Sequence, residues 1–476
     1  MDSASISFIG YGLLVAWMVS WSQSARWRGA VVLLASVAML AMLGATPLNL
    51  LPMAVFLAVG YMGMKLAARF DGTMAIFVVL IIVEFAYLKK YTFFPEHAFI
   101  GQFYFTLGLS YVFFRVLHLM IEYGNLRKET RPGIGAYLCY TLNFTTLVSG
   151  PIQRYSDFHE QLAIAEDRKL DLDVIVAQLA RIVVGYFKVN VIASLLDIAR
   201  VDAYTTLGLP GSDLTHITCA LALVAIYPFF LYTNFSGYID IVVALARLMR
   251  IRLPENFDRP FSASSFLDFW NRWHITLSQW LKFYVYNPLL MFLMRRVSSA
   301  AIQPYLGVAS FFVTFFLIGV WHGRTSEFAV FGLLQGGGVA INKLWQIFMA
   351  KRMGKKGYKA LTGSPTYIAL GRGLTFSWFA FTMFWFWGDW QQIAFVFRGL
   401  SFPQWIAVWS IVIVAAAAGL TAWTTARQTI GAAAGEPEAN WLSYSKAVLI
   451  GVAVFSSFFY CALLDQPAPG IIYKAF

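Results

Sequence analysis

The sequence predicts an all-α, polytopic membrane protein. Of its 476 residues, 59% are hydrophobic and only 13% are charged, whereas a soluble domain carries about 25% charged residues. An apolar segment of about 20 residues crosses the hydrocarbon core of a bilayer, so the apolar runs predict about 11–13 transmembrane helices. No long polar stretch separates these runs, so we expect a single membrane-embedded domain over residues 1–476.

Charge and cysteine content disfavour several other classes. Lysine and arginine outnumber aspartate and glutamate by 36 to 24, a net charge of +12. In a membrane protein this excess is typical of cytoplasmic loops that face anionic lipid, so we expect the lipid bilayer, and no nucleic acid, as partner. The cysteines have the spacing of neither a metal site nor a disulfide framework. We interpret them as packing residues: Cys139, Cys219 and Cys461.

The apolar runs give the predicted spans in chain order. The first group is Ile6–Trp21, Ala30–Gly44, Leu48–Leu66, Met74–Leu88, Phe103–Ile121 and Gly135–Ser149. The most polar stretch, Asp157–Asp173, is predicted to be a solvated loop. Later runs are Val174–Leu196, Leu214–Leu248, Phe311–Val320, Phe328–Ile341, Tyr367–Trp387, Trp405–Trp423 and Ala447–Leu464. The opening MDSASISF carries an acid and no base, so we expect the first span to be retained rather than cleaved.

Basic connectors predict the orientation of these spans. Those after the first, third and fifth runs lie on one side of the membrane, and the positive-inside rule makes that side cytoplasmic. They carry Arg26, Arg28, Lys65, Arg69, Arg127, Lys128 and Arg131. The basic block Lys351–Lys359 is the strongest marker of the same side. Lys89 and Lys90 fall on the other side and count against the assignment. Both termini are then predicted to lie outside.

The stretch Pro254–Lys282 breaks the apolar pattern. Ser265 and Asp268 have the spacing of a helix-capping box. A helix continuing from there would have two distinct faces. One face carries Trp270, Trp273, Leu277, Trp280 and Tyr284, and the other carries Asn271, His274, Ser278 and Lys282. We predict an interfacial or re-entrant amphipathic helix. A plain aromatic-belt helix also explains the tryptophans, but it explains His274 poorly.

The stretch Leu317–Gly338 places His322 at the junction of two apolar runs. An imidazole there is costly to desolvate, and it is also the side chain best suited to accept a proton near neutral pH. The alternative is a structural core histidine bonded to a backbone carbonyl. Gly332 and Gly336 have GxxxG spacing, which favours close helix packing over ligand binding.

Two acids, Asp240 and Glu84, lie inside apolar runs. Such acids are either functional or paired with an intramembrane arginine, for which Arg115 is a candidate. The sequence contains no P-loop, no GxGxxG after a strand and no GxSxG motif.

Five motifs in a fixed order resemble those of the membrane-bound O-acyltransferase family. They are SGPIQRYSDF (Ser149–Phe158), FSGYID (Phe235–Asp240), RLPENFDRPF (Arg252–Phe261), FWNRWHITLSQWL (Phe269–Leu281) and VWHG (Val320–Gly323). The motif core covers residues 149–349. It is most similar to the bacterial branch that contains the alginate O-acetylation and teichoic-acid D-alanylation membrane proteins. The sequence departs from the family pattern at Ser326, Glu327 and Gln335, where tryptophan, asparagine and histidine are common.

The resemblance implies a ring of helices around a central tunnel in the bacterial cytoplasmic (inner) membrane. It implies no metal and no tightly bound cofactor. The donor would be a cytoplasmic thioester, acetyl-CoA or the phosphopantetheine of an acyl carrier protein. An extracytoplasmic polysaccharide or an acyl-relay protein would be the acceptor. His322 matches the catalytic histidine and His274 the second recurrent histidine. The expected tunnel residues are Trp321, Asn271, Trp273, Asp240 and Ser278.

The chemistry suits these residues. A thioester has a good leaving group, because thiols ionise at a pKa of about 8.5. The hydroxyl acceptor needs a base, which His322 could supply before returning the proton to the thiolate. Asn271, His274 or the Trp321 N–H could stabilise the oxyanion.

The run Asn287–Arg296, NPLLMFLMRR, ends in two arginines. It is predicted to be either an ordinary interfacial helix end or a docking surface for an acidic carrier protein. In the second case Leu289, Leu290, Arg295 and Arg296 would bind the donor. Pro288 and Leu289 are similar to the alginate branch, and Leu290 and Met291 to the D-alanyl branch.

We therefore expect a membrane-bound enzyme that moves an acyl group, acetyl as first choice, from a cytoplasmic thioester to an extracytoplasmic hydroxyl. D-alanyl or other aminoacyl transfer from a carrier protein is the enzymatic alternative. A transporter or flippase without catalysis is the alternative of another class. It is disfavoured because the sequence shows no internal repeat.

Overall fold

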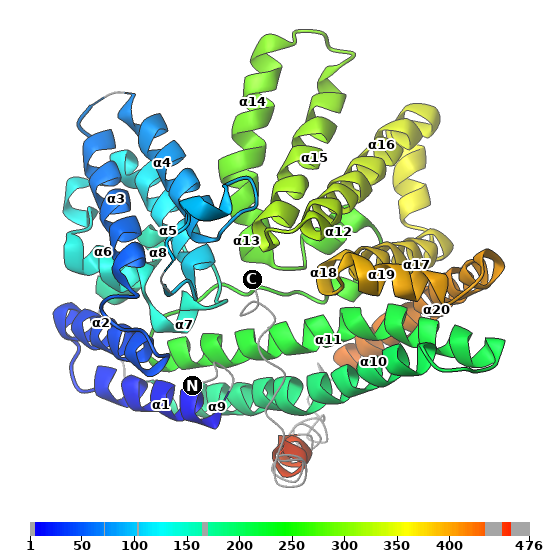
Figure 1. The fold of residues 1–476 in the computed structure, drawn as a ribbon, viewed down its shortest axis with the longest axis horizontal. Coiled ribbons are helices and arrows are strands. Elements are labelled where there is room, and N and C mark those ends of the chain that lie inside the picture. The colour runs from blue at the N-terminus through cyan, green and yellow to red at the C-terminus, as the bar shows by residue number, and fades with distance from the viewer. Residues whose placement is uncertain (1–4, 71, 102–103, 164–169, 434–449, 458–476) are drawn as a thin grey trace. The chain divides into compact units, whose positions relative to one another are not determined.

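The structure is built of apolar helices (Figure 1). It is a computed structural model that describes residues 5–70, 72–101, 104–163, 170–433 and 450–457. Within these ranges the chain forms helices and no strand. In the described part of the chain, five helical segments are long and apolar enough to cross a membrane: Ala25–Met42, Leu172–Leu207, Asp213–Leu248, Gln303–His322 and Phe402–Thr429. Shorter apolar helices are Ile6–Val19, Leu51–Ala67 and Thr73–Leu88. The predicted all-α, polytopic class is confirmed. The number of crossings and the ring around a tunnel stay predictions.

The chain divides into two units, the first made of residues 1–190 and 235–255. In this unit α3 packs against both α4 and α5, and α1 packs against α2. Its helices are α1 (Ile6–Val19), α2 (Ala25–Met42), α3 (Leu51–Ala67), α4 (Thr73–Leu88), α5 (Leu109–Glu122), α6 (Ile134–Thr141), α7 (Phe144–Leu147), α8 (Tyr155–Ala163) and α9 (Leu172–Phe187), with short 3₁₀ turns at Glu96–Ala98, Tyr123–Asn125 and Lys128–Thr130. The last part of α11 (Asp213–Leu248) also belongs to this unit.

The predicted span 135–149 is wrong, because the chain breaks there into α6 and α7. Asn143 caps α7 by accepting a hydrogen bond from the Thr145 N–H. The buried guanidinium of Arg115 donates to the Thr141 carbonyl at 2.9 Å and also to the carbonyls of Tyr140 and Thr146. These bonds satisfy carbonyls that a broken helix leaves open. Arg115 therefore donates its hydrogen bonds to backbone carbonyls and is not the ion-pair partner of Asp240 or Glu84.

The solvated loop predicted over 157–173 is also corrected in part. Its first residues belong to helix α8, and residues 164–169 lie outside the described chain. The buried Arg28 donates to the carbonyls of Gln161 (3.2 Å) and Leu162 (3.4 Å) near the end of α8. Arg28 therefore makes carbonyl hydrogen bonds in the interior of its unit and is not the cytoplasmic loop charge that the sequence predicts.

Helices α9 and α11 cross closely at two glycines. A Cβ added to Gly237 would lie 2.7 Å from the Gly185 carbonyl oxygen, and one added to Gly185 would lie 2.5 Å from the Gly237 carbonyl oxygen. One turn further along α11, the Asp240 carboxylate accepts from Arg181 at 2.9 Å and from Lys188 at 2.7 Å. The FSGYID motif thus supplies both a close backbone crossing and an ion pair between the same two helices.

The second unit comprises residues 191–234 and 256–464. Its helices are α10 (Ser194–Leu207), the first part of α11, α12 (Phe266–Trp270), α13 (Ile275–Leu281), α14 (Asn287–Arg296), α15 (Gln303–His322), α16 (Ser326–Thr362), α17 (Pro365–Thr382), α18 (Phe384–Trp387), α19 (Trp390–Arg398) and α20 (Phe402–Ala433). A 3₁₀ turn, Pro260–Ser262, precedes α12. π-Helical turns at Lys188–Ala193 and Lys282–Tyr286 lead into α10 and α14. Of the predicted last span, 447–464, residues 450–457 are described and helical.

Two long helix pairs dominate this unit: α15 lies along α16, and α17 packs against α20 (Figure 1). A Cβ on Gly332 would lie 2.5 Å from the Phe316 carbonyl oxygen, and a Cβ on Gly336 would lie 2.7 Å from that of Phe312. The predicted packing role of these glycines is confirmed. Helix α16 continues through the basic block 351–359, with a kink at Gly354 (φ 71°). The chain ends 1–4 and 458–476 lie outside the described residues, so the predicted orientation stays a prediction.

Substitution of Gly237 by valine should destabilise the first unit, because its side chain would meet the α9 backbone. Overpacking of this kind costs about 1–3 kcal/mol, measurable as a lower Tm in detergent. Gly419→Val is the matched control, since a Cβ at Gly419 in α20 meets nothing within 4 Å. Equal Tm values for the two variants would contradict the close crossing.

Candidate active site

His322 is the last residue of α15 and lies inside an aromatic enclosure. It is 5% exposed. Ring centroids of Trp321, Phe386 and Phe331 lie 4.8, 5.1 and 5.9 Å from its own. The helix ends here because Gly323 takes an extended conformation (φ −166°), and a side chain at Gly323 would collide with the ring of Phe328. The VWHG motif thus leaves an imidazole at a helix end with little access to water.

His274 lies between α12 and α13 in left-handed backbone conformation (φ 43°). This conformation is uncommon for a residue with a side chain and costs about 1–2 kcal/mol, so neighbouring contacts must hold it. Asn256 supplies them. Its carbonyl oxygen accepts from the Ile275 N–H at 2.9 Å, and its Oδ1 accepts from the Thr276 N–H at 3.1 Å and the Thr276 hydroxyl at 2.7 Å. Asn256 therefore caps α13 and fixes the turn that carries His274.

The second unit contains both predicted catalytic histidines. Both are buried, His274 with 1% and His322 with 5% of its surface exposed. Burial lowers the pKa of His274 well below its ordinary value, so the ring is neutral at physiological pH. A neutral imidazole offers one hydrogen-bond donor and one acceptor. The pair therefore combines a proton acceptor with a second polar group in a dry environment.

The continuous amphipathic helix predicted for 265–282 is wrong. Ser265 does cap α12 by accepting from the Asp268 N–H at 3.2 Å, but α12 ends at Trp270 and α13 begins only at Ile275. The break arises because Asn256 takes the first N–H groups of α13 and holds His274 out of helical conformation. The predicted tryptophan-rich face and the predicted polar face therefore do not lie along one continuous helix.

The other predicted tunnel residues of this unit differ in their surroundings. Asn271 is exposed in the turn before His274. Ser278 is half-buried, and its hydroxyl donates to the Trp273 carbonyl at 3.4 Å. Trp273 is buried and stacks on Phe269 with ring centroids 5.5 Å apart. Trp273 thus contributes to an aromatic core, while Asn271 stays accessible.

Asp240 lies in the first unit, in its ion pairs with Arg181 and Lys188. The predicted pairing of this acid with an arginine is confirmed, with Arg181 rather than Arg115 as the partner. Nothing in the fold assigns Asp240 to the histidine pair.

The departures from the family pattern form a hydrogen-bonded set. Gln335 is buried and accepts from the Trp270 indole at 3.3 Å, while its amide donates to the Thr382 hydroxyl at 2.8 Å. Ser326 and Glu327 both bind Trp390 at the start of α19, the serine at its indole (2.8 Å) and the glutamate at its backbone N–H (3.2 Å). These residues connect α16 to α12, α17 and α19.

Asn256, Phe386 and Trp390 are among the residues of the site that sequence reasoning missed. Asn256 lies within the quoted RLPENF motif, but it bonds to Thr276, 20 residues further along the chain, so no local capping signal marked its role. Phe386 and Trp390 gave no such signal, because contacts across more than 60 residues are not encoded in local spacing.

Across the described parts of the chain, no group of three or more histidine, cysteine, aspartate or glutamate side chains is arranged to hold a metal ion. The predicted donor-side residues lie on α14, which buries none of its side chains in the structure. Leu289 and Leu290 are half-exposed, and Arg295 and Arg296 are exposed.

Together these features define a polytopic membrane protein with a buried pair of histidines at helix ends. Residues 125–367 match the family model of the membrane-bound O-acyltransferase family, about half of the chain. The chain belongs to this family, and the resemblance seen in its motifs is confirmed.

Several relatives are similar to this chain. A teichoic acid D-alanyltransferase from Streptococcus thermophilus is 30% identical over 276 residues, 57% of this chain and 65% of that protein. A peptidoglycan O-acetyltransferase from Helicobacter pylori is 30% identical over 209 residues, 44% and 37% of the two chains. A probable alginate O-acetylase from Pseudomonas syringae pv. tomato is 30% identical over 238 residues, 50% and 42%. The chain thus spans less than two thirds of the length of these three relatives.

Asn256→Ala should lower Tm, because it leaves the buried donors of Thr276 without their acceptor. Removing one partner of a buried hydrogen bond costs about 1–3 kcal/mol. Asn271→Ala is the control, since that side chain is exposed in the neighbouring turn and its loss should leave Tm almost unchanged. If the two variants melt alike, the Asn256 cap does not hold the site.

Proposed function

We propose that this protein transfers an acyl group from a cytoplasmic thioester to a hydroxyl group of an extracytoplasmic acceptor. The observation that carries the proposal is the burial of His322 and His274 in one unit, within the region matched by the family model. Family membership removes the basis for a transporter or flippase. The location proposed is the bacterial inner membrane, with the basic block 351–359 on the cytoplasmic side.

His322 is proposed as the general base. The acceptor hydroxyl attacks the thioester carbonyl carbon while its proton passes to the imidazole, and the tetrahedral intermediate then expels the thiolate. The imidazolium returns the proton to that thiolate, so charge and protons balance. General-base catalysis contributes typically about 10²–10⁴-fold. The aromatic enclosure of His322 limits access of water, which would otherwise compete with the acceptor.

His274 is proposed to stabilise the developing oxyanion or to position the donor. Its neutral ring can donate one hydrogen bond, and Asn271 and Trp321 offer further donors beside the two histidines in sequence. No metal or bound cofactor takes part in this scheme. The thioester itself is a co-substrate.

The acyl group remains open between two candidates. Acetyl is proposed first, because peptidoglycan and alginate O-acetylating proteins are among the relatives. D-alanyl is proposed second. The alignment with the teichoic acid D-alanyltransferase of Streptococcus thermophilus covers a larger share of both chains than the alignments with the two O-acetylating relatives. The acceptor would be a cell-envelope polysaccharide or a protein that relays the acyl group to it.

His322→Ala should abolish transfer of labelled acyl groups to the cell-envelope fraction, whereas His274→Ala should only reduce it. Both reductions should appear in kcat, since the groups act on the reacting atoms. His216→Ala, at a histidine in the first turn of α11, is the control and should match the wild type. Activity of His322→Ala within a few-fold of wild type would exclude it as the base.

The surface of α14 is proposed as the docking site for the donor. Met291, Phe292 and Met294 are exposed, and Arg296 lies over the ring of Phe292 at 4.4 Å. An exposed apolar strip ending in two arginines suits an acidic carrier protein. The same features suit an interfacial helix end, so the donor must be varied experimentally.

Leu290→Asp combined with Arg295→Glu should slow transfer from an acyl carrier protein several-fold while leaving transfer from free acyl-CoA almost unchanged. A small donor needs only the mouth of the tunnel, whereas a carrier protein needs the surface. Rates with each donor at low and high salt provide the measurement. The control, Leu209→Asp with Arg398→Glu, makes the same charge change at exposed positions elsewhere in the second unit. Equal slowing with both donors, or none with either, would rule out docking on α14.

A further inference from the structure

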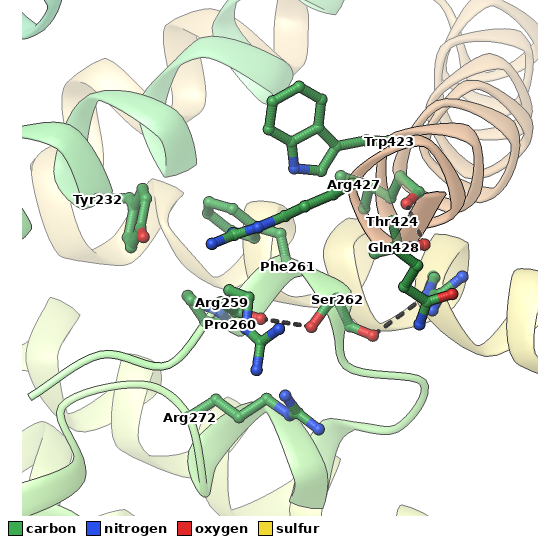
Figure 2. Close-up of a pocket in the computed structure, with 12 residues that line it drawn as sticks. Tyr232, Arg259, Pro260, Phe261, Ser262, Arg272, Trp423, Thr424, Arg427 and Gln428 are labelled. Carbon is green, nitrogen blue, oxygen red and sulfur yellow. Dashed lines mark hydrogen bonds between the residues drawn. The ribbon is translucent and has the colours of Figure 1, made fainter. Parts of the chain in front are cut away.

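A cavity of about 650 Å³ in the second unit is lined by four arginines. Figure 2 shows Arg259, Arg272 and Arg427 gathered around one space. Arg259 precedes the 3₁₀ turn Pro260–Ser262, Arg272 lies between α12 and α13, and Arg427 lies near the end of α20. The fourth, Arg372, comes from α17. Four separate elements thus direct guanidinium groups to one cavity.

The carboxylates near this cavity neutralise only part of its charge. Asp258 pairs with Arg259 at 2.9 Å and with Arg272 at 3.8 Å, and Asp268 pairs with Arg272 at 3.0 Å. Arg372 donates to neutral oxygens, the Ser262 carbonyl and the Thr421 hydroxyl, both at 3.1 Å. Among the residues that the structure describes, no carboxylate is within ion-pair distance of Arg427. Four guanidinium groups face two carboxylates, so an excess of positive charge remains.

The arginines interact with each other through space. The charge of Arg272 acts on Arg372 as a like-charge repulsion. The hydrogen bond from Arg259 holds the pKa of the Asp258 carboxyl below its usual range, and the charges of Arg272 and Arg427 act in the same direction. Arg427 therefore belongs to the cluster electrostatically. A bound anion would relieve the repulsion, and guanidinium groups match phosphate oxygens in bidentate geometry.

Aromatic side chains form a further part of the wall. Trp423, one turn before Arg427 on α20, is 66% exposed and lines the cavity together with Phe261 and Tyr232. A second cavity in the same unit, of about 590 Å³, is lined by a single arginine, Arg398. The first cavity therefore differs from the second in its concentration of arginines.

We propose that this cavity binds the phosphate group of a phosphorylated organic ligand, with the arginines on the phosphate and Trp423 on the adjoining organic moiety. Two sources carry this chemistry: the nucleotide part of a CoA thioester, or the headgroup of an anionic phospholipid. A CoA source rests on the proposed acyl transfer, because CoA would then be the donor. Phosphate binding as such does not depend on that function.

The test measures binding rather than transfer. The full-length protein is placed in phosphatidylcholine nanodiscs, and the affinity of labelled CoA is compared with that of dephospho-CoA. A second preparation contains labelled phosphatidylglycerol, and the lipid retained by the protein is measured. Both are repeated with Arg427→Gln, with Arg427→Lys, which keeps the charge, and with the control Arg398→Gln. Arg427 is exposed, and Tm verifies that each variant is folded.

For a nucleotide source, CoA should bind more tightly than dephospho-CoA, and Arg427→Gln should weaken CoA binding on the order of tenfold. Arg427→Lys should lose less affinity for CoA than Arg427→Gln, and Arg398→Gln should bind CoA as tightly as the wild type. For a lipid source, Arg427→Gln should instead lose retained phosphatidylglycerol. Either result supports the proposal, and both effects should shrink as salt rises. Unchanged CoA and lipid binding in Arg427→Gln would overturn it.

The outcome is separable from that of the proposed function. His322→Ala should bind CoA or lipid like the wild type even though it transfers nothing. Transfer that survives in His322→Ala would overturn the base assignment and leave the phosphate site standing. Binding that survives in Arg427→Gln would overturn the phosphate site and leave the base assignment standing.

Discussion

The close approach of α15 and α16 is the constraint on which the candidate active site depends. Gly319, Gly332 and Gly336 leave no room for a side chain between the two backbones. Without aqueous solvent to drive apolar association between membrane helices, such packing is a main source of helix pairing. Because α15 ends at His322 and α16 supplies Phe331, the separation of these helices also sets the size of the aromatic enclosure around the imidazole.

Three buried polar side chains hold breaks or ends of helices by binding the backbone. Arg28 and Arg115 hold carbonyls, and Asn256 holds N–H groups at the start of α13. Away from water an open backbone group costs several kcal/mol, so each break in a helix requires a side chain with matching polarity. The breaks at 142–143 and 271–274 are stabilised in this way. The second of them holds His274 in its unusual backbone conformation.

Sequence reasoning predicted the fold class and the histidine pair because both depend on local signals. Apolar runs located α2, α11, α15 and α20, although α15 begins well before its predicted run and α20 ends well after its own. The motif pattern indicated His322 and His274. Sequence reasoning failed at the broken helices. Arg115 and Asn256 form hydrogen bonds with segments distant in the sequence, and periodicity does not show which distant segments lie together. Sequence reasoning also assigned Arg28 to a loop, because a charge count does not distinguish a surface arginine from one that binds buried carbonyls.

The contact between Ser326 and Trp390 has an evolutionary consequence. The serine hydroxyl accepts the indole N–H, whereas an indole at position 326, common in the family pattern, has a donor and no acceptor. A chain with tryptophan at 326 therefore cannot keep this bond to a tryptophan at 390. A lineage that changes either position, 64 residues apart from the other, loses this bond. The bond from the Trp390 backbone N–H to Glu327 then holds the start of α19 on α16.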